Sequence, residues 1–233
     1  MSPRRYHAPR RRAAAAATRR RIVEAVVALH AERGVTRTSY AMIAARADVA
    51  TPTVYNHFPT PGDLLVACAG HVLAGAPPLG PEIFAGTADL ESRLHALAHA
   101  LCATYRYLAP WLRWSVHEAV LVRELAERLE RMAESRRRLI AMALAPACGR
   151  KPPETLMAWC EILLDFPAWQ RLARDHDGAA DAVAQRLARA LIALAREALR
   201  DPEQGCSAIE ARQCDKGGED AQPHGNRARH SPH

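Results

Sequence analysis

The stretch Thr38–Phe58, TSYAMIAARADVATPTVYNHF, decides the fold of this 233-residue chain. It predicts two short helices joined by a tight turn. In its first half, Ile43, Ala44 and Ala47 recur at helical spacing, and Asp48 tolerates the left-handed backbone that a sharp turn requires. The second half has a narrow apolar anchor surrounded by hydrogen-bonding groups. Such a polar face is typical of a helix that enters the major groove of DNA. An ordinary helical hairpin with a solvated face has the same pattern.

Capping residues set the expected starts of these helices and of the next one. Thr38 is the N-cap candidate of the first helix, because its hydroxyl oxygen can accept a hydrogen bond from a first-turn amide. Thr51 is the candidate for the second helix, with Pro52 at the first helical position. Thr60 and Pro61 repeat that arrangement and start a further helix.

Positive charge is concentrated in the first quarter of the chain. Residues 1–58 contain 11 Arg, no Lys and three acidic residues, which gives them a net charge of +8. The whole chain carries +7, so residues 59–233 carry −1. A basic region joined to a nearly neutral body is typical of nucleic-acid binding. Because this charge adjoins the helix pair, it favours DNA binding over a solubilising tail.

The N-terminus, MSPRRYHAPRRRAAAAATRRR, is expected to form a flexible basic arm over residues 1–17, before a helix from about Thr18 to Arg33. Arginines in the first turn of that helix oppose its dipole, which suggests contact with phosphates. Counterion release would make such binding steeply salt-dependent, and part of the arm could enter a minor groove. An Arg-rich, acid-free start also fits an organelle transit peptide, but Ala13–Ala17 is too short for a secretory signal.

The composition favours helices throughout. Ala, Leu and Arg are abundant, only 5% of residues are aromatic, and 49% are hydrophobic, which suffices for a substantial core. No run approaches the roughly 18 apolar residues of a membrane span. The six cysteines are widely spaced without a CxxC pair, so we expect a reduced, cytoplasmic protein.

The helical pattern divides the chain into four parts. After the arm, residues 18–73 are expected to form a helix-turn-helix domain and a linking helix. Residues 74–200 begin with a Pro/Gly-rich connection and continue as a larger helical domain with a break at Pro110. Residues 201–233 are polar, lack an apolar period, and are expected to be disordered. The prediction is an all-α protein of about nine helices.

The last two expected helices, about Glu154–Arg174 and Ala179–Leu199, are more apolar than surface helices require. The final one carries Val183, Leu187, Leu191 and Leu194 along one stripe, with alanines beside it. Small residues allow helices to approach closely, so this pair is the predicted dimer face. Packing within one chain would produce the same pattern.

The N-terminal region resembles the tetracycline-repressor (TetR) family of bacterial transcriptional regulators. The resemblance covers about residues 18–68 in residue type, order and spacing. The matching positions are Ile22, Ala25, Leu29, Gly34, Thr38, Ser39, Ile43, Ala44, Ala47, Val49, Thr53, Val54, Tyr55, His57, Phe58, Asp63, Leu64 and Leu65. It implies a homodimer whose third helices read two half-sites of a near-palindromic operator. It also implies a C-terminal domain that binds a small effector and dimerises through its last two helices.

The resemblance further implies which residues contact double-stranded DNA. Thr38 and Ser39 lie at a usual phosphate contact. Contacts with bases or with the nearby backbone are implied for Ala50, Thr51, Pro52, Thr53, Tyr55, Asn56 and His57. The chain departs from the family at three positions: Ala50 replaces a common Ser, Asp48 a frequent Gly, and Pro61 a common Lys. We expect the arginine arm to replace the missing lysine contact.

Aromatic residues near Pro110 and on a later helix are the candidates for lining an effector pocket, with a plain aromatic core as the alternative. The candidates are Tyr105, Trp111, Trp114, His117, Trp159 and Phe166. His95 and His99 are four residues apart, a spacing that can bind a metal, but no acidic or cysteine pair lies nearby in the sequence. We therefore expect neither a metal site nor a cofactor.

The sequence thus predicts a sequence-specific, ligand-responsive transcriptional regulator of the bacterial cytoplasm, associated with the nucleoid and acting as a repressor. Two other classes stay open. An architectural DNA-binding protein would need no pocket and would discriminate poorly between sequences. A helical enzyme lacks support, because the chain has no nucleophile–base pair and no Gly-rich phosphate loop.

Overall fold

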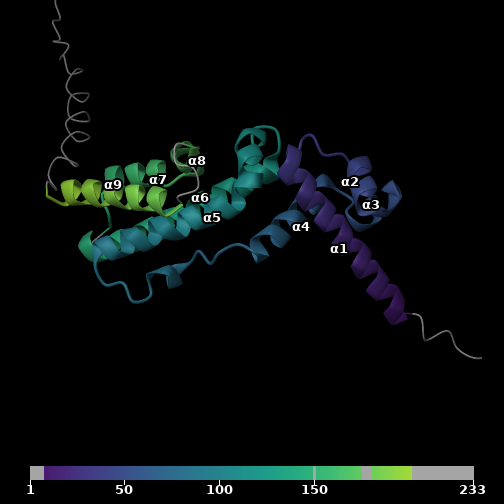
Figure 1. Ribbon diagram of the computed structural model, residues 1–233, viewed down its shortest axis with the longest axis horizontal. Helices are drawn as coiled ribbons and strands as arrows, with labels where there is room; N and C mark the ends of the chain where they lie inside the picture. Colours follow the sequence, from purple (N-terminus) through teal and green to yellow (C-terminus); the bar gives the residue numbers. More distant parts are fainter. Residues whose placement is uncertain (1–7, 149–150, 175–179, 201–233) are drawn as a thin grey trace, which may run out of the picture.

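The computed structural model of the protein describes residues 8–148, 151–174 and 180–200. These ranges form nine α-helices and one 3₁₀-helix, without a strand, which confirms the predicted all-α class. The elements are α1 (Ala8–Arg33), α2 (Tyr40–Ala47), α3 (Thr51–His57), α4 (Pro61–Ala74), η1 (Pro81–Phe84), α5 (Leu90–Glu118), α6 (Arg123–Cys148), α7 (Glu154–Leu163), α8 (Phe166–Arg174) and α9 (Ala180–Arg200). Helices α1–α4, called the head, lie at one end of the elongated molecule, and α5–α9, called the body, at the other (Figure 1).

Helix α1 begins at Ala8, so the prediction of a start near Thr18 is wrong. Pro9 suits the first turn of a helix, because its missing N–H has no partner there. The run Ala13–Ala17 follows, and alanine has the highest helix propensity of all residue types. Residues 8–17 of the expected flexible arm are therefore helical, and the N-terminal half of α1 extends beyond the other helices (Figure 1). Residues 1–7 and the tail expected at 201–233 lie outside the described residues.

Helix α2 is capped one residue later than predicted. Ser39 is the N-cap, and its hydroxyl oxygen accepts a hydrogen bond from the Met42 amide at 3.3 Å. The Thr38 hydroxyl instead donates to the Gly34 carbonyl at 2.7 Å. Asp48 adopts the left-handed backbone expected of the turn, with φ of 52°. The turn therefore forms at the predicted residue.

Helices α3 and α4 start in different ways. The N-cap of α3 is Ala50, which has no side-chain hydrogen bond, so Thr51 is the first helical residue rather than the predicted cap. In α4 the predicted Thr60 cap is confirmed. Its hydroxyl accepts from the Asp63 amide at 3.1 Å, and the Asp63 carboxylate accepts from the Thr60 amide at 3.0 Å. This reciprocal capping box fixes the start of the helix that leads from the head toward the body.

The head has a continuous apolar core built from α1–α4. Its most deeply buried side chains are Ile22, Val26, Ile43, Val54 and Phe58, each no more than 1% exposed. They include the apolar stripes of α1 and α2 and the apolar anchor of α3. The core leaves the remaining face of the short helix α3 free.

Helix α5 continues through Pro110, so the predicted break at this residue is wrong. A proline inside a helix costs about 3 kcal/mol, because it removes one hydrogen bond and crowds the preceding turn. Packing on both sides offsets that cost. Leu108 and Leu112 are buried, and Trp111 donates from Nε1 to the Val27 carbonyl of α1 at 2.9 Å.

The helix expected over Glu154–Arg174 is two helices, α7 and α8. Asp165 separates them, and its carboxylate accepts a hydrogen bond from the Ala168 amide at 2.7 Å, as an N-cap side chain does. Pro167 follows in the first turn of α8. The sequence Asp165-Phe166-Pro167 therefore contains a helix-start signal that the periodicity alone conceals.

The apolar stripe of α9 is buried inside its own chain. Val183, Leu187 and Leu191 are at most 3% exposed, and α9 packs mainly on α5. This stripe cannot itself be the predicted dimer face, because its side chains already fill the core. Any dimer contact of α9 must use its other side.

No helix within the described ranges has the length and apolar content needed to cross a membrane.

Candidate nucleic-acid interface and ligand cavity

The nine residues predicted to contact DNA lie at the start of α2 and in α3 with its N-cap. Ser39, Ala50, Pro52, Tyr55 and Asn56 are exposed, and the other four are half-buried. Two of the nine already have structural hydrogen bonds, since the Ser39 hydroxyl caps α2 and the Thr38 hydroxyl binds the Gly34 carbonyl. The segment therefore presents one polar surface rather than scattered side chains.

An aromatic pair supports the outer face of α3. The rings of Tyr40 and Tyr55 stack with centroids 4.1 Å apart and an interplanar angle of 10°. The Tyr40 hydroxyl donates to the Phe58 carbonyl at 3.0 Å, which ties α2 to the end of α3. Tyr55 is thus held in a defined orientation while half of its surface stays exposed.

Polar groups of α3 have no partners within the described part of the chain. Thr51, Thr53 and Asn56 form no side-chain hydrogen bond or ion pair there, in contrast to the two hydroxyls of α2. Asn can bind adenine through two hydrogen bonds, and Thr can contact bases or phosphates. These three side chains therefore provide the chemistry that base readout needs.

Basic side chains lie on α1 and α2, the helices that pack with α3 in the head. The Arg19 guanidinium lies 4.7 Å from the centre of the Phe58 ring, and Arg21 lies 4.0 Å from the Asp48 carboxylate. Arg46 pairs with Glu32, and this contact lowers the pKa of that carboxyl. Further out on α1, residues 10–12 are three exposed arginines. Three of the arginines predicted for a flexible arm, residues 10–12, thus lie on a helix that is continuous with the head.

The body holds the head through the C-terminal end of α5. The Trp111 and Trp114 indoles donate to the carbonyls of Val27 and Ala31 near the end of α1, the latter at 3.0 Å. Arg113 also donates to the Ala31 carbonyl, at 2.8 Å. A carbonyl in the last turn of a helix has no partner within the helix, so these donors satisfy an otherwise free acceptor.

Glu118, the last residue of α5, binds the α1–α2 loop with both carboxylate oxygens. They accept hydrogen bonds from the Val35 amide at 2.8 Å and from the Thr36 amide at 3.1 Å, and the Thr36 hydroxyl donates as well. Gly34 makes this approach possible. A Cβ atom at residue 34 would lie 2.4 Å from a Glu118 oxygen, and its φ of +85° also favours glycine.

His30 lies beside this contact and is 6% exposed. Burial lowers its pKa from 6.5 to about 4, and the Glu118 carboxylate opposes that shift only in part. The imidazole is therefore neutral at physiological pH. An uncharged His30 and the carboxyl group of Glu118 thus form the polar part of the boundary between head and body.

Two adjoining cavities lie where α4, α5 and α6 meet. The seam cavity, of about 70 Å³, lies between head and body and is lined by His30, Trp111, Trp114 and Glu118 together with apolar residues of α4 and α6. The body cavity, of about 580 Å³, lies between α5, α6 and the connection over residues 76–79. Leu73, Leu108, Arg128 and Met132 border both. A molecule in either cavity would therefore contact α4, which is part of the head.

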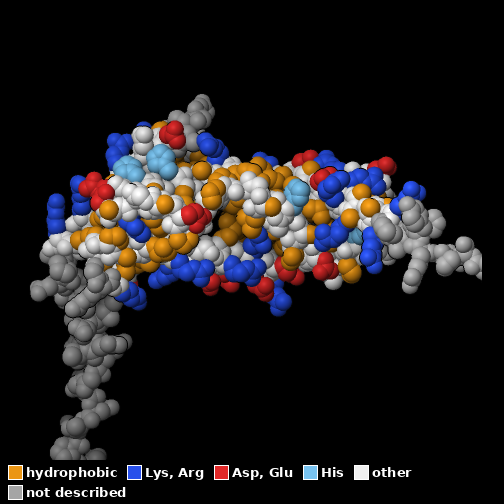
Figure 2. All heavy atoms as spheres, turned by 90° about the horizontal axis from the view of Figure 1, so that it is seen from below, with side chains coloured by type: hydrophobic (Ala, Val, Ile, Leu, Met, Phe, Trp, Pro, Cys, Tyr) orange, Lys and Arg blue, Asp and Glu red, His pale blue; other side chains and the backbone are white. Residues whose placement is uncertain are grey.

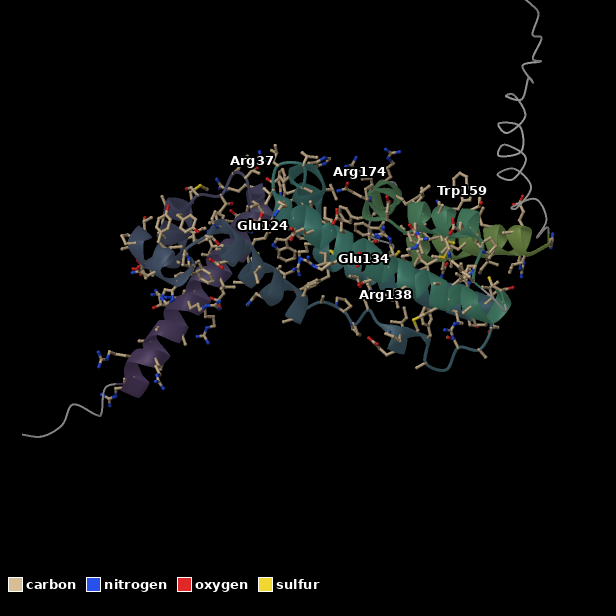
Figure 3. The ribbon with its side chains drawn as sticks, turned by 180° about the vertical axis from the view of Figure 1, so that it is seen from behind. Arg37, Glu124, Glu134, Arg138, Trp159 and Arg174 are labelled. Carbon is tan, nitrogen blue, oxygen red and sulfur yellow. The ribbon has the colours of Figure 1, made fainter. Side chains whose placement is uncertain are left out.

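Half of the predicted pocket residues line these cavities. Trp111 and Trp114 border the seam cavity, and Tyr105 borders the body cavity. The expectation fails for the other three. Phe166 packs against Tyr105 and Trp169 in the core, and His117 is exposed on the outside of α5. Trp159 is 51% exposed on α7 and points away from the body (Figure 3).

Sequence reasoning missed the polar side chains of the cavities. Arg128, Arg131, Ser135 and Arg136 line the body cavity from one side of α6, and Glu118 is the carboxylate at the seam. Arg128, Arg131 and Ser135 follow one another at intervals of three and four, which is a helical spacing. That signal indicates a shared face, but it does not show whether the face meets solvent or a cavity.

Comparison with known proteins identifies the region that forms the head. Residues 22–68 match the family model described as bacterial regulatory proteins, tetR family. No curated protein matches the chain in sequence. Among solved structures, a TerR/AcrR-family transcriptional regulator from Aquifex aeolicus VF5 is 17% identical, with a TM-score of 0.51 over 76% of this chain and 99% of its own. SmeT in complex with triclosan is 18% identical, with a TM-score of 0.53 over 76% and 90%. These two structures share the fold.

Proposed function

We propose that this chain, which belongs to the tetR family of bacterial regulatory proteins through its N-terminal domain, represses transcription from a near-palindromic operator and is released by a small effector. The observation that carries the proposal is the face of α3, whose Thr51, Thr53 and Asn56 side chains have no hydrogen-bond partner among the described residues and which belongs to a head rich in arginine. We further propose that it acts in the cytoplasm on the nucleoid. Sequence selection followed by footprinting tests the proposal. A discrete palindromic site is expected, and uniform coverage would indicate an architectural DNA-binding protein instead.

Base readout is assigned to α3. Replacing Thr53 or Asn56 by Ala should weaken binding to the selected site about tenfold or more and relax specificity at one base pair per half-site. The same change should alter binding to random DNA much less. His71→Gln, an exposed change on α4, is the matched control. If these variants lose the same affinity for the selected site and for random DNA, α3 does not read the base sequence.

Phosphate contacts are assigned to Arg10, Arg11 and Arg12 on the extension of α1. This assignment revises the flexible-arm hypothesis, since these residues are helical. Replacing all three by Gln should reduce the slope of log affinity against log salt by up to about 2.7, if each contacts one phosphate. A triple Arg→Gln variant of residues 106, 123 and 138 makes the same change in net charge within the body. If both variants reduce the slope equally, the α1 extension has no specific role.

Effector binding is assigned to the two cavities. Support comes from their position: their walls include α4 of the head and the end of α5, which binds α1 and the α1–α2 loop. A molecule that moves α4 or the end of α5 would therefore change the orientation of the head. The related fold of SmeT was solved with triclosan bound, which supports a ligand-binding body in this fold. Titration of the DNA complex with candidate effectors tests the coupling.

Dimerisation is assigned to the exposed sides of α7 and α9. Trp159 and Ile162 are 51% and 56% exposed and lie three residues apart on α7. The double change Trp159→Glu and Ile162→Glu should convert a dimer into a monomer, as measured by light scattering after gel filtration. The double change Val120→Glu and Leu121→Glu places the same charge at two other exposed apolar residues and should leave the dimer intact. A monomeric wild type would disprove the assignment.

A further inference from the structure

The body cavity has two facing helical walls. On α5, the wall consists of Leu101, Thr104, Tyr105 and Leu108, which follow one another at helical spacing. On α6, the wall consists of Arg128, Arg131, Met132, Ser135 and Arg136. Residues 76–79 of the connection close a third side with apolar side chains. A volume of about 580 Å³ lies within the usual range of small-molecule sites.

The charge on these walls is entirely positive. Three arginines line the body cavity, and no Asp or Glu does. The sequence offers Glu124 and Glu127 as i,i+4 partners of Arg128 and Arg131, but neither pair forms within the described residues. Glu127 instead pairs with Arg123 at 3.3 Å. The cavity therefore holds cationic groups without the anions that usually accompany them.

Individual arginines have unused bonding capacity. Arg128 and Arg131 form no hydrogen bond or ion pair with any described residue, and burial together with the neighbouring Arg131 lowers the pKa of Arg128. Arg136 donates to the Tyr105 hydroxyl at 3.2 Å, but its Nε atom is buried without a partner. A buried donor without a partner is costly, and an anionic oxygen is the acceptor that guanidinium groups bind best.

Apart from Thr104, Tyr105 and Ser135, the remaining lining residues of the cavity are apolar. They include Leu73, Leu108 and Met132, which also border the seam cavity beside α4. Seen from below, the surface is hollowed near the middle of the molecule, with hydrophobic side chains around the hollow, Lys or Arg side chains nearby and an acidic side chain at its edge (Figure 2). Such a site suits a molecule with one anionic group and an apolar remainder.

We propose that the effector is an amphiphilic carboxylate, whose anionic group binds the α6 arginines and whose apolar part lies between α5, α6 and the connection. This proposal rests on the proposed function, because it names the chemical class of the effector. It disfavours cationic ligands, which would meet like charge. It also disfavours neutral ligands, which would leave the half-buried Arg128 and the buried Nε atom of Arg136 without an anionic acceptor.

Three ten-carbon probes of different charge test the proposal: decanoate, decan-1-ol and decyltrimethylammonium, each used below its micellar concentration. Calorimetry on the full-length protein should show decanoate binding at least about tenfold more tightly than decan-1-ol, as expected for a charge-assisted hydrogen bond. The cation should not bind measurably. Equal binding of alcohol and carboxylate, or tighter binding of the cation, would overturn the proposal.

Arginine variants locate the interaction. Arg131→Gln and Arg128→Gln should each weaken decanoate binding about tenfold and leave binding of decan-1-ol unchanged. A variant that fails to fold would bind both decanoate and decan-1-ol more weakly. The ratio of decanoate affinity to decan-1-ol affinity therefore distinguishes a lost contact with the carboxylate from a lost fold. Arg123→Gln, on the same helix but outside the cavity, should leave the ratio as in the wild type. If the ratio of decanoate affinity to decan-1-ol affinity stays at the wild-type value in Arg128→Gln, in Arg131→Gln and in the double variant, the proposal is wrong.

A DNA assay separates this proposal from the proposed function. If the protein binds no discrete DNA site, the proposed function fails, while the ratio of carboxylate to alcohol affinity still decides the ligand class. If it binds a discrete site from which only neutral or cationic compounds release it, the regulator stands and the carboxylate proposal is wrong. Release by decanoate in the wild type, and its loss in Arg131→Gln, supports both.

Discussion

In the head, the helices begin and end at local signals, whereas in the body long-range packing decides where they end. Ser39, the left-handed Asp48 and the Thr60–Asp63 capping box each act within a few residues of the chain. In the body, α5 runs through Pro110 because side chains far away in the sequence hold it. Together, these regions combine a head with closely specified helix boundaries and a body that contains a cavity.

The head and the body also differ in how tightly their interiors are packed. The head core is closed around Phe58 and Val54, while the body contains a cavity large enough for a small molecule. Cavities reduce stability, because the atoms that line them lose packing partners. We therefore expect the same kind of truncation to cost much more in the head than at the cavity wall.

The largest effect is expected from Phe58→Ala. This side chain is 1% exposed, so its loss should reduce the free energy of unfolding by about 3–5 kcal/mol. Met132→Ala, at the half-buried wall shared by both cavities, should cost about 1 kcal/mol or less, because its side chain already borders empty space. Urea unfolding measures both. Similar costs would mean that the head is no better packed than the body.

The next effect concerns the contact that joins the two regions. Glu118→Ala leaves the Val35 amide and the Thr36 amide and hydroxyl without an acceptor, and should reduce the free energy of unfolding by about 2–3 kcal/mol. It should also weaken the effect of an effector on DNA affinity. Glu124→Ala, an exposed change near the start of α6, is the control. An unchanged stability would show that the loop does not depend on α5.

A pH dependence should follow from His30 at the same boundary. Its folded pKa of about 4 lies below the unfolded value of 6.5, so the unfolded state binds a proton first as the pH falls. The contribution of His30 to the free energy of unfolding is therefore fully present above about pH 6.5 and is lost as the pH falls from 6.5 to 4. From pH 7 to pH 5 the expected loss is about 2 kcal/mol.

The His30→Gln variant isolates this contribution. Urea unfolding at several pH values should show a shallower slope between pH 5 and 7 than in the wild type. His71→Gln removes an exposed histidine of α4 and should keep the wild-type slope. Identical slopes in all three proteins would mean that His30 is not buried in solution.

The smallest effect is expected at the start of α4. Thr60→Ala removes one half of the capping box and should cost about 1 kcal/mol. Ser92→Ala, at the third residue of α5, leaves the Asp89 cap in place and should cost less. Thermal unfolding measures both changes. A negligible cost for Thr60→Ala would show that packing, rather than capping, positions α4.

Apart from the start of α1, which lies ten residues before the predicted Thr18, the sequence predicted the head more closely than the body because the signals of the head are local. The turn at Asp48 and the cap at Thr60 were both predicted and both formed. The error at α2 was one residue, since Thr38 and Ser39 both carry a hydroxyl and only the position of Gly34 decides which of them caps.

The body was harder to predict because its decisive contacts join distant residues. Pro110 is a helix breaker by local rules, and only the contacts of Trp111 and Trp114 with α1 show why α5 continues. The pocket prediction weighted aromatic residues and passed over Arg128 and Arg131. Whether an arginine faces solvent or a cavity depends on the helices opposite it, and no periodicity encodes that choice.

The unbroken helix α1 makes the molecule sensitive to small movements at the boundary. Its 26 residues extend over about 39 Å, from the first turn near Arg10 to the tryptophan contacts and Gly34 at the other end. A rotation of about 5° at that end would move the N-terminal tip by about 3 Å, as a lever arm does. A ligand would then need to shift α5 only slightly to displace a row of guanidinium groups by the length of a hydrogen bond.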